Sequence, residues 1–144
     1  MQFFTSLISL LAVATTSVLA QSAKTGAPPN ATEVAAGSNF TMMVERPDTS
    51  IGSREISLVI GLASCANCPG PSKELGTTLY NGGFDPKFTS KPGTTTLPPH
   101  QNFTLTVPST FPQGPAQLGV AHFALVGAST QPFFETFSTT LIIT

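Results

Sequence analysis

The only two cysteines of the chain, Cys65 and Cys68, stand in the sequence C-A-N-C, which has the spacing of a redox-active dithiol. Such a dithiol reacts when its first cysteine begins a helix, because the helix N-terminus lowers the pKa of the thiol. Here a Pro-Gly-Pro sequence follows and favours a turn. In an exported protein the pair indicates a local Cys65–Cys68 disulfide that shapes one loop, with redox activity as the alternative. So short a bridge contributes less than the roughly 3 kcal/mol expected for a 15-residue loop.

Two histidines are the remaining candidate metal ligands. His100 follows a Pro-rich segment, and His122 falls within a long apolar run. Zinc requires four ligands at characteristic spacings, which these residues do not provide, so we predict no metal and no cofactor. His122 is in phase with Leu118, Val120 and Val126. This pattern favours a packed, hydrogen-bonded histidine over a functional one.

The acidic side chains are scattered singly along the chain, so the sequence shows no pair of carboxylates for general acid and base catalysis. They are Glu33, Glu45, Asp48, Glu55, Glu74, Asp85 and Glu135. No G-x-S-x-G sequence marks a nucleophilic serine either. Although a Ser-His-acid set can assemble from distant segments, we predict that the protein is not an enzyme and has no catalytic residues.

Three asparagines stand in N-x-Thr glycosylation sequences: Asn30, Asn39 and Asn102. Asn39 and Asn102 each stand at the polar start of a predicted strand, just before an inward-facing phenylalanine, where a sugar could project freely. A chain rich in serine and threonine also contains such sequences by chance. Occupied and unoccupied sites are both compatible with the sequence.

Residues 1–20 are typical of a secretory signal peptide. An apolar stretch ends in Val18-Leu19-Ala20, the small-residue pattern that a signal peptidase requires, and we place cleavage before Gln21. A membrane-spanning anchor is the alternative, but the apolar part is short for the roughly 20 residues that a span needs. Residues 21–29 then predict a flexible leader, and residues 30–144 a single domain. The C-terminal sequence shows no lipid-anchor signal, so we expect a secreted, extracellular protein.

The chain carries few charges, which limits its partners. Only 9% of its residues are charged, and its net charge is −1. There is no basic surface for nucleic acid and no polybasic patch for anionic lipid. We therefore predict neither a nucleic-acid partner nor a membrane anchor.

The fold class follows from alternation along residues 102–128. In residues 103–107 the apolar side chains of Phe103, Leu105 and Val107 alternate with threonines, which predicts a strand with one buried face. Residues 117–126 predict a longer, central strand, and residues 55–62 a second buried one. Shorter strands are expected at residues 31–36, 39–45, 74–80 and 133–144, with a turn at residues 81–83 and a long connection between sheets at residues 84–100. These patterns predict an all-β fold, a small antiparallel immunoglobulin-like or fibronectin-like β-sandwich of about six to seven strands.

The order of these elements carries a resemblance to a known family. It rests on residues 56–62 (ISLVIGL), Leu75-Gly76, Leu79, Asn81-Gly82, Phe84, residues 102–108 (NFTLTVP), Phe111-Pro112, Gly114, His122-Phe123 and Gly127-Ala128. In this order the chain resembles the Nis1 family of fungal secreted effectors. The resemblance does not extend to the Cys65 and Cys68 loop, and it carries over no active-site residues.

This resemblance implies a small fungal virulence protein, secreted during plant colonisation. Such a protein would suppress pattern-triggered immunity by binding host immune receptor kinases and cytoplasmic kinases, and it could induce cell death. Its action would lie either outside the host cell or in the host cytoplasm. Residues 64–71 and 84–100 are the loops that we expect to form a recognition surface, although both could be ordinary connections.

A cell-wall-associated structural or carbohydrate-binding module is the alternative function. Small exported β-sandwiches can bind glycans through exposed aromatic rings, and Tyr80 and Phe84 flank a turn that could display them. The absence of tryptophan and the single tyrosine weaken this alternative. Cell-wall polysaccharide therefore stands as the second candidate partner.

Overall fold

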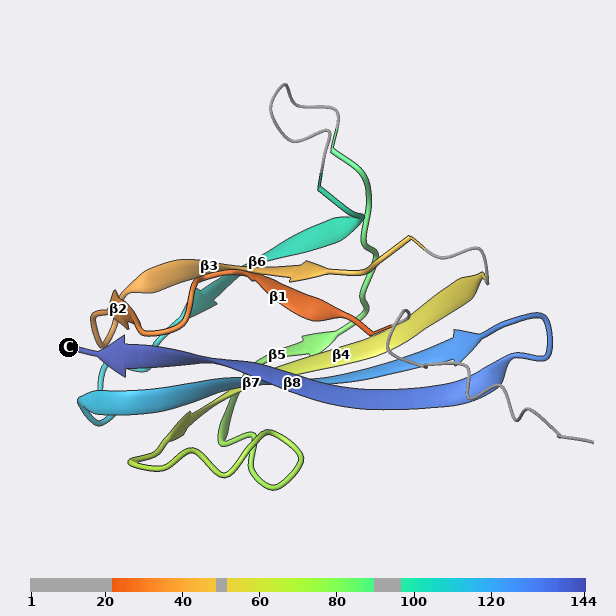
Figure 1. Cartoon of the computed structure of the whole chain (residues 1–144). Helices are drawn as coiled ribbons and strands as arrows, with labels where there is room; N and C mark the ends of the chain where they lie inside the picture. Colours follow the sequence, from red (N-terminus) through yellow and green to blue (C-terminus); the bar gives the residue numbers. More distant parts are fainter. Residues whose placement is uncertain (1–21, 49–51, 90–96) are drawn as a thin grey trace, which may run out of the picture.

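The computed structural model describes residues 22–48, 52–89 and 97–144, and this part of the chain folds into two stacked β-sheets without a helix (Figure 1). Its strands are β1 (Lys24–Ala27), β2 (Thr32–Val34), β3 (Asn39–Glu45), β4 (Ser53–Ser64), β5 (Thr77–Gly82), β6 (His100–Thr106), β7 (Gly114–Val126) and β8 (Gln131–Ile143). The predicted all-β fold is therefore confirmed. The described residues hold eight strands, more than the six or seven expected.

One sheet has three strands in the order β1-β3-β6, and the other has five in the order β2-β8-β7-β4-β5. The long strand β7 pairs with both β4 and β8 over most of its length, so the prediction of a central strand is confirmed. The strand predicted at residues 55–62 is β4, which lies between β7 and β5. Strand β2 runs parallel to β8, a departure from the purely antiparallel sandwich that we expected.

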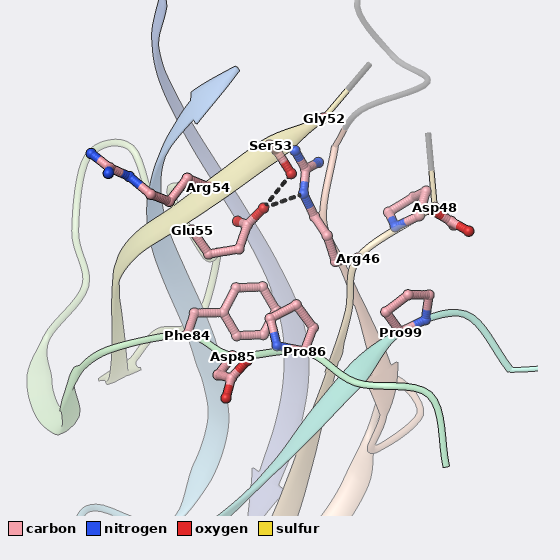
Figure 2. Close-up of a pocket in the computed structure, with 11 residues that line it drawn as sticks. Arg46, Asp48, Gly52, Ser53, Arg54, Glu55, Phe84, Asp85, Pro86 and Pro99 are labelled. Atoms are coloured by element: carbon pink, nitrogen blue, oxygen red, sulfur yellow. Dashed lines mark hydrogen bonds and ion pairs between the residues drawn. The ribbon is translucent and has the colours of Figure 1, made fainter. Parts of the chain in front are cut away.

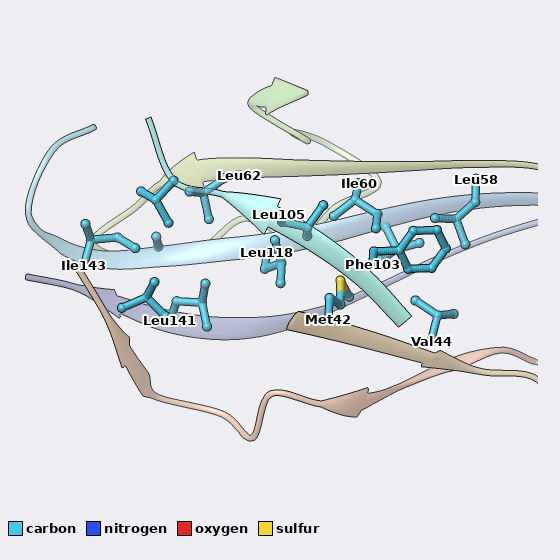
Figure 3. Packing of buried hydrophobic residues seen from close by; sticks show 14 of the residues in the cluster. Met42, Val44, Leu58, Ile60, Leu62, Phe103, Leu105, Leu118, Leu141 and Ile143 are labelled. Carbon is cyan, nitrogen blue, oxygen red and sulfur yellow. The ribbon is translucent and has the colours of Figure 1, made fainter. Parts of the chain in front are cut away.

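The core lies between the two sheets and is built by the inward face of each strand (Figure 3). Strands β3 and β6 contribute Met42, Val44, Phe103 and Leu105, and the five-stranded sheet contributes Leu58, Ile60, Leu62, Leu118, Val120, Leu141 and Ile143. In β6 the threonines between these positions are exposed, as the alternation predicts. Each Å² of buried apolar surface contributes about 25 cal/mol to the free energy of folding. The burial of these side chains is therefore the main source of stability.

The predicted flexible leader at residues 21–29 is wrong for Lys24–Ala27, which form β1. This strand pairs antiparallel with β3, and the Ala23 side chain before it is buried. With its glycine and prolines, the segment resembles a linker in sequence. It nevertheless forms a strand, because backbone pairing and one small buried side chain are enough to hold an edge strand. Residues 1–20, the predicted signal peptide, lie outside the described residues.

The boundaries of β5 also differ from the prediction. Residues 73 and 74 belong to a turn in which the backbone N–H groups of Lys73 and Glu74 donate to the Gly70 carbonyl. Asn81 and Gly82, which we expected to form a turn, are the last residues of β5. The Tyr80 hydroxyl donates to the Gly83 carbonyl at 2.7 Å, so the chain is held just after the end of β5.

Residues 65–76 form a loop that covers part of the outer face of the five-stranded sheet (Figure 1). Gln117 on β7 holds it with both ends of its side-chain amide, accepting from the Gly70 N–H and donating to the Glu74 carbonyl, each at 2.9 Å. Glycine at positions 61 and 119 lets the loop approach the sheet, since a Cβ on Gly119 would lie 2.9 Å from Pro71. The glycines of the sheet therefore position this loop.

We predict that Gly61→Ala destabilises the protein by about 1–3 kcal/mol, the usual cost of overpacking. The added methyl group would meet the backbone carbonyl of Leu75, which cannot rotate away as a side chain could. Gly83→Ala is the matched control, because a Cβ at that position meets nothing within 4 Å. Urea unfolding of the two variants tests this, and equal midpoints would contradict the proposed loop contact.

Candidate functional site

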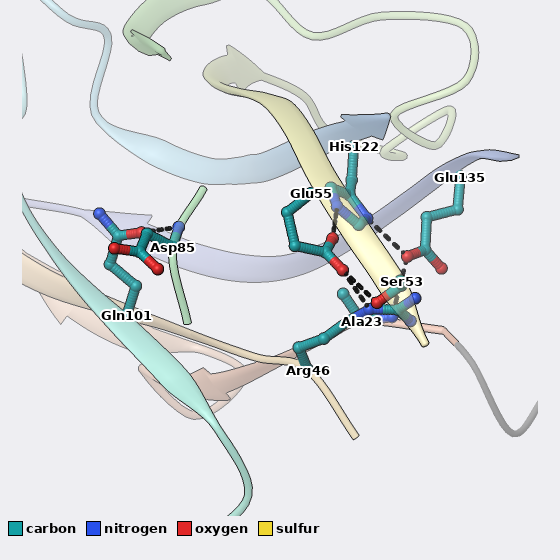
Figure 4. A network of polar contacts seen from close by, with 8 residues as sticks. All are labelled: Ala23, Arg46, Ser53, Glu55, Asp85, Gln101, His122 and Glu135. Atoms are coloured by element: carbon teal, nitrogen blue, oxygen red, sulfur yellow. Dashed lines mark hydrogen bonds and ion pairs between the residues drawn. The ribbon is translucent and has the colours of Figure 1, made fainter. Parts of the chain in front are cut away.

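A cluster of charged side chains lies buried at one end of the sandwich (Figure 4). It joins Glu55 of β4, His122 of β7 and Glu135 of β8 with Arg46, which follows β3 in the other sheet. Glu55, His122 and Glu135 come together on three neighbouring strands of one sheet, whereas Arg46 joins them only because the two sheets pack together. It is the main grouping of chemically active side chains in the described residues.

The imidazole of His122 lies between two carboxylates. His122 and Glu135 are directly opposite each other in the β7–β8 pair, and the imidazole Nδ1 is 2.8 Å from Glu135 Oε1. The other ring nitrogen, Nε2, forms an ion pair with Glu55 Oε2 at 2.5 Å. A register shift in β4 at residues 55–57 accompanies this approach. A ring with a carboxylate at each nitrogen needs a proton on both, so the geometry specifies the imidazolium form.

The same carboxylates connect the cluster to its surroundings. Glu55 Oε1 accepts hydrogen bonds from Arg46 Nε at 3.0 Å and from the Ser53 hydroxyl at 2.7 Å. The Arg46 contact crosses from one sheet to the other. Glu135 Oε1 accepts the backbone N–H of Ala23 at 2.9 Å, which fixes the start of β1 against β8. The cluster therefore links both sheets and the N-terminal strand.

Opposite effects act on the pKa values of these groups. Burial raises the pKa of the Glu55 carboxyl, but hydrogen bonds from His122 and Ser53 and the charge of Arg46 outweigh it and lower this pKa to about 2. Burial lowers the pKa of His122, yet its hydrogen bonds to Glu135 and Glu55 and their negative charges raise it above 6.5. Both directions favour the ionised forms, in agreement with the geometry.

Ser53, Glu55 and His122 are the residue types of a hydrolase triad, but their connections differ from those of a triad. The serine hydroxyl donates to the carboxylate, and carboxylates occupy both imidazole nitrogens, so neither nitrogen can take a proton from the serine. His122 is also fully buried. This arrangement suits an internal structural network. Within the described ranges, no group of three or more His, Cys, Asp or Glu residues could hold a metal ion.

A surface cavity of about 500 Å³ lies beside the cluster (Figure 2). It is lined by Arg46, Pro47, Asp48, Gly52, Ser53, Arg54, Glu55, Phe84, Asp85, Pro86 and Pro99. Charges of both signs are mixed along its wall, and Arg46 and Glu55 neutralise each other. The lining therefore selects neither an anionic nor a cationic ligand.

The residues singled out in the sequence are spread over the fold. Cys65 and Cys68 are joined by a disulfide in the loop after β4, their sulfur atoms 2.07 Å apart. His100 is the first residue of β6, and its Nδ1 lies 2.8 Å from the Pro98 carbonyl. His122 is packed and hydrogen-bonded, as we favoured from its phase.

All three glycosylation sequences place their asparagine on the surface. Asn39 and Asn102 lie on β3 and β6 of the three-stranded sheet, and both are exposed. Asn30 is also exposed, and its side-chain carbonyl accepts from the Thr139 hydroxyl at 2.9 Å and the Thr140 N–H at 3.1 Å. Attachment of sugar at these sites stays a prediction.

The aromatic pair proposed for glycan stacking is not displayed. Phe84 is only 4% exposed and packs its ring 5.3 Å from that of His122. Tyr80 is half-buried and its ring lies 4.7 Å from that of Phe103. Among the described residues, the exposed aromatic rings are instead Phe88, at 63%, and Phe134, at 65%.

The sequence contained a signal for the charge cluster that we did not use. His122 and Glu135 are polar exceptions at inward positions of two neighbouring strands, and a hairpin turn near residues 127–130 places them opposite each other. Pairing the two exceptions would have predicted the contact. Arg46 and Ala23 gave no such signal, because their approach depends on the packing of one sheet on the other.

The fold and cluster define a two-sheet β-sandwich domain organised around internal ion pairs. The model of the Nis1 family matches residues 18–142, and this chain therefore belongs to the Nis1 family. The resemblance stated from the sequence is confirmed. In the described part of the chain, no helix has the length and apolar character needed to cross a membrane.

Other known proteins add little. No curated protein sequence matches the chain. Two solved structures of superoxide reductase (neelaredoxin) from Ignicoccus hospitalis, one of them T24K, are similar at TM-scores of 0.45 and 0.43 and identities of 14% and 13%. Each similarity covers 84% of this chain and 80% of the other. At this level it assigns no activity to the present chain.

We predict that His122→Leu destabilises the protein by about 3–5 kcal/mol, because it leaves two buried carboxylates without their shared cation. His100→Leu is the matched control. That variant removes one hydrogen bond to a neutral carbonyl and should cost about 1 kcal/mol. Glu135→Gln should recover part of the loss in the His122→Leu background but not in the wild type. Equal losses for the two histidine variants in urea unfolding would contradict the ion-pair assignment.

We also predict that the cluster stabilises the fold most between about pH 4.5 and 6.5. The pKa of Glu55 is lowered from 4.5 to about 2, so its contribution is complete above pH 4.5 and is lost as the pH falls toward 2. The pKa of His122 is raised above 6.5, so its contribution is complete below pH 6.5 and is lost as the pH rises through the raised value. Unfolding midpoints measured across this range test both limbs. The decrease on the alkaline side should be absent from His122→Leu, and its persistence there would assign it to another group.

Proposed function

We propose that this protein is a secreted fungal effector that binds host immune receptor kinases and cytoplasmic kinases, and so suppresses pattern-triggered immunity and can induce cell death. Membership of the Nis1 family over residues 18–142 is the observation that carries this proposal. The buried cluster supports a binding role over a catalytic one, because its acidic, basic and hydroxyl groups are engaged with one another.

We propose the outer face of the five-stranded sheet as the kinase-binding surface. Val59, Ala121 and Thr136 lie in one row across this face, and Ser57, Phe123 and Phe134 lie in the next. The outer face of a two-layer sandwich is ordinarily polar, so the exposed Phe134 beside the half-buried Phe123 is a feature typical of protein contact. A cavity of about 340 Å³ lies between Phe134 and the loop residues 71–75.

The three glycosylation sequences agree with this choice. Asn39 and Asn102 are on the other sheet, and Asn30 lies beside the edge where β2 meets β8. Sugar attached at these positions would leave the outer face of the five-stranded sheet open to a protein partner. The face and the loop beside it would then form one continuous binding surface.

The two loops first expected to form one recognition surface lie on different sides of the sandwich (Figure 1). Residues 64–71 belong to the loop over the five-stranded sheet. Residues 84–89 instead approach the three-stranded sheet, where Lys87 pairs with His100. Only the first loop adjoins the proposed surface, so the two segments can be tested separately.

Phe134→Ser should weaken binding to purified plant immune kinase domains at least about tenfold, because a side chain that anchors an interface can contribute 2 kcal/mol or more. Phe88→Ser is the matched control, since Phe88 is equally exposed but lies in the other segment. Titration calorimetry with the oxidised protein from Gln21 onward would measure both, alongside sedimentation with chitin and β-glucan.

The outcomes test the proposed kinase binding and the proposed binding surface separately. If the wild type binds no kinase domain, the proposed function is wrong, and retention by polysaccharide would then favour a cell-wall module. If the wild type binds and Phe88→Ser is the weakened variant, the function stands and the surface is wrong. Weakening by Phe134→Ser alone supports both.

A further inference from the structure

The two sheets have four edge strands among the described residues, and three of these edges carry features that discourage pairing with another chain. β1 has an exposed lysine, Lys24, and a register shift. β2 is only three residues long, and β5 has a register shift opposite β4. Short strands, bulges and charged side chains are the usual means of protecting sheet edges.

The fourth edge, β6, has none of these features. It pairs with β3 in unbroken register over seven residues, and its sequence HQNFTLT contains no lysine, acid or proline. Alternating apolar and threonine residues of this kind pair readily with a second strand. The remaining question is which of its backbone groups face outward.

The hydrogen bonds at the two ends of β6 answer this question. Beside β3, the Pro99 carbonyl accepts from the Arg46 N–H, and the Val107 N–H donates to the Ser38 carbonyl. On the opposite side, His100 exchanges both of its backbone bonds with Lys87, at 3.0 and 3.1 Å. Because successive residues of a strand bond to opposite sides, the backbone groups of residues 102, 104 and 106 point toward the edge.

The chain segment that covers the beginning of this edge does not continue along it. The Asp85 N–H donates to Gln101 Oε1 at 2.7 Å and not to a backbone carbonyl of β6 (Figure 4). The side chain of Phe84, the residue before Asp85, is buried in the core. In the described structure no strand pairs with the outward groups of residues 102–106, so this part of the edge is open.

A glycosylation sequence lies on this open part. Asn102 and Thr104 are its first and third residues, and both are exposed. Both are also among the residues whose backbone groups point toward the edge. Phe103 between them is buried and holds the strand in place. Asn39 differs in its position: it is exposed on the same sheet, but its strand β3 pairs with β6 along its whole length and with β1 at residues 43–45, whereas β6 pairs with β3 alone among the described strands.

We propose that Asn102 is glycosylated and that its glycan covers the open edge of β6, which prevents edge-to-edge pairing with a second copy of this chain. In the reaction, Asn102 Nδ2 loses a proton and bonds to C1 of an oligosaccharide, which leaves its lipid diphosphate carrier in the secretory pathway. The glycan would take the place of the lysine, the register shifts and the short strand that protect the other edges. This role is independent of kinase binding.

The first test uses full-length protein secreted from a eukaryotic host. Peptide mapping should find Asn102 occupied, and enzymatic removal of N-glycans from the folded protein should cause self-association in light scattering at concentrations where the glycosylated protein is monomeric. An unoccupied Asn102, or a deglycosylated protein that stays monomeric, would overturn the proposal. Deglycosylation after folding keeps a requirement for the glycan during folding out of the result.

Variants then locate the interface. Asn102→Gln and Thr104→Val both remove the glycosylation sequence and should strengthen self-association at least about tenfold, whereas Thr104→Ser retains the sequence and should stay monomeric. Asn39→Gln removes a sugar from the same face but leaves the glycan beside the open edge of β6 in place, so it should also stay monomeric. Adding Thr104→Lys to Asn102→Gln should restore the monomer, because a charge on an edge opposes pairing. Self-association that persists in this double variant would place the contact elsewhere and overturn the edge assignment.

Discussion

The interaction on which the polar interior depends is that of the buried His122 imidazolium with Glu55 and Glu135. Removing ions from water costs several kcal/mol each, so buried carboxylates are tolerated only where a cation and hydrogen bonds compensate them. Here two cations, His122 and Arg46, face two carboxylates. Glu55, His122 and Glu135 compensate one another within the five-stranded sheet, and the ion pair of Arg46 with Glu55 forms when the sandwich closes at this end.

This requirement also selects the register of the long strands. β7 and β8 each have thirteen residues, and alternation alone specifies which face is buried but not which residues are opposite each other. Pairing His122 with Glu135 fixes that choice. The register shift in β4 allows Glu55 to join them while Leu58 and Ile60 stay in the core. A network that adds little net stability can in this way specify one arrangement among several of similar hydrophobic content.

The sequence predicted the parts of the fold that depend on local alternation: the two-sheet fold class, the central position of β7, and the inward faces of β3, β6 and β8. It did not predict β1, because an edge strand of small residues has no apolar period. It left open that Phe84 is displayed beside a turn, since a turn signal does not specify the direction of the side chain after it, and the structure buries this residue. Part of the cluster could have been predicted, because His122 and Glu135 occupy inward positions of the alternating pattern. The contribution of Arg46 came from sheet packing and had no local pattern.

The low charge of the chain explains why its sequence contains few candidate functional residues. It also explains which residues make the outer faces polar. With 9% charged residues, there are few lysines and acids to make outer faces polar or to protect strand edges. Threonine and asparagine fulfil the first role on the three-stranded sheet, where Asn39, Thr41, Asn102 and Thr104 are exposed. The five-stranded sheet has Phe123 and Phe134 in the equivalent outward positions. Because the buried carboxylates and the His122 imidazole are engaged with one another, the partner binding that we propose would use such outer surfaces. The face without glycosylation sequences is the one whose composition suits a protein partner.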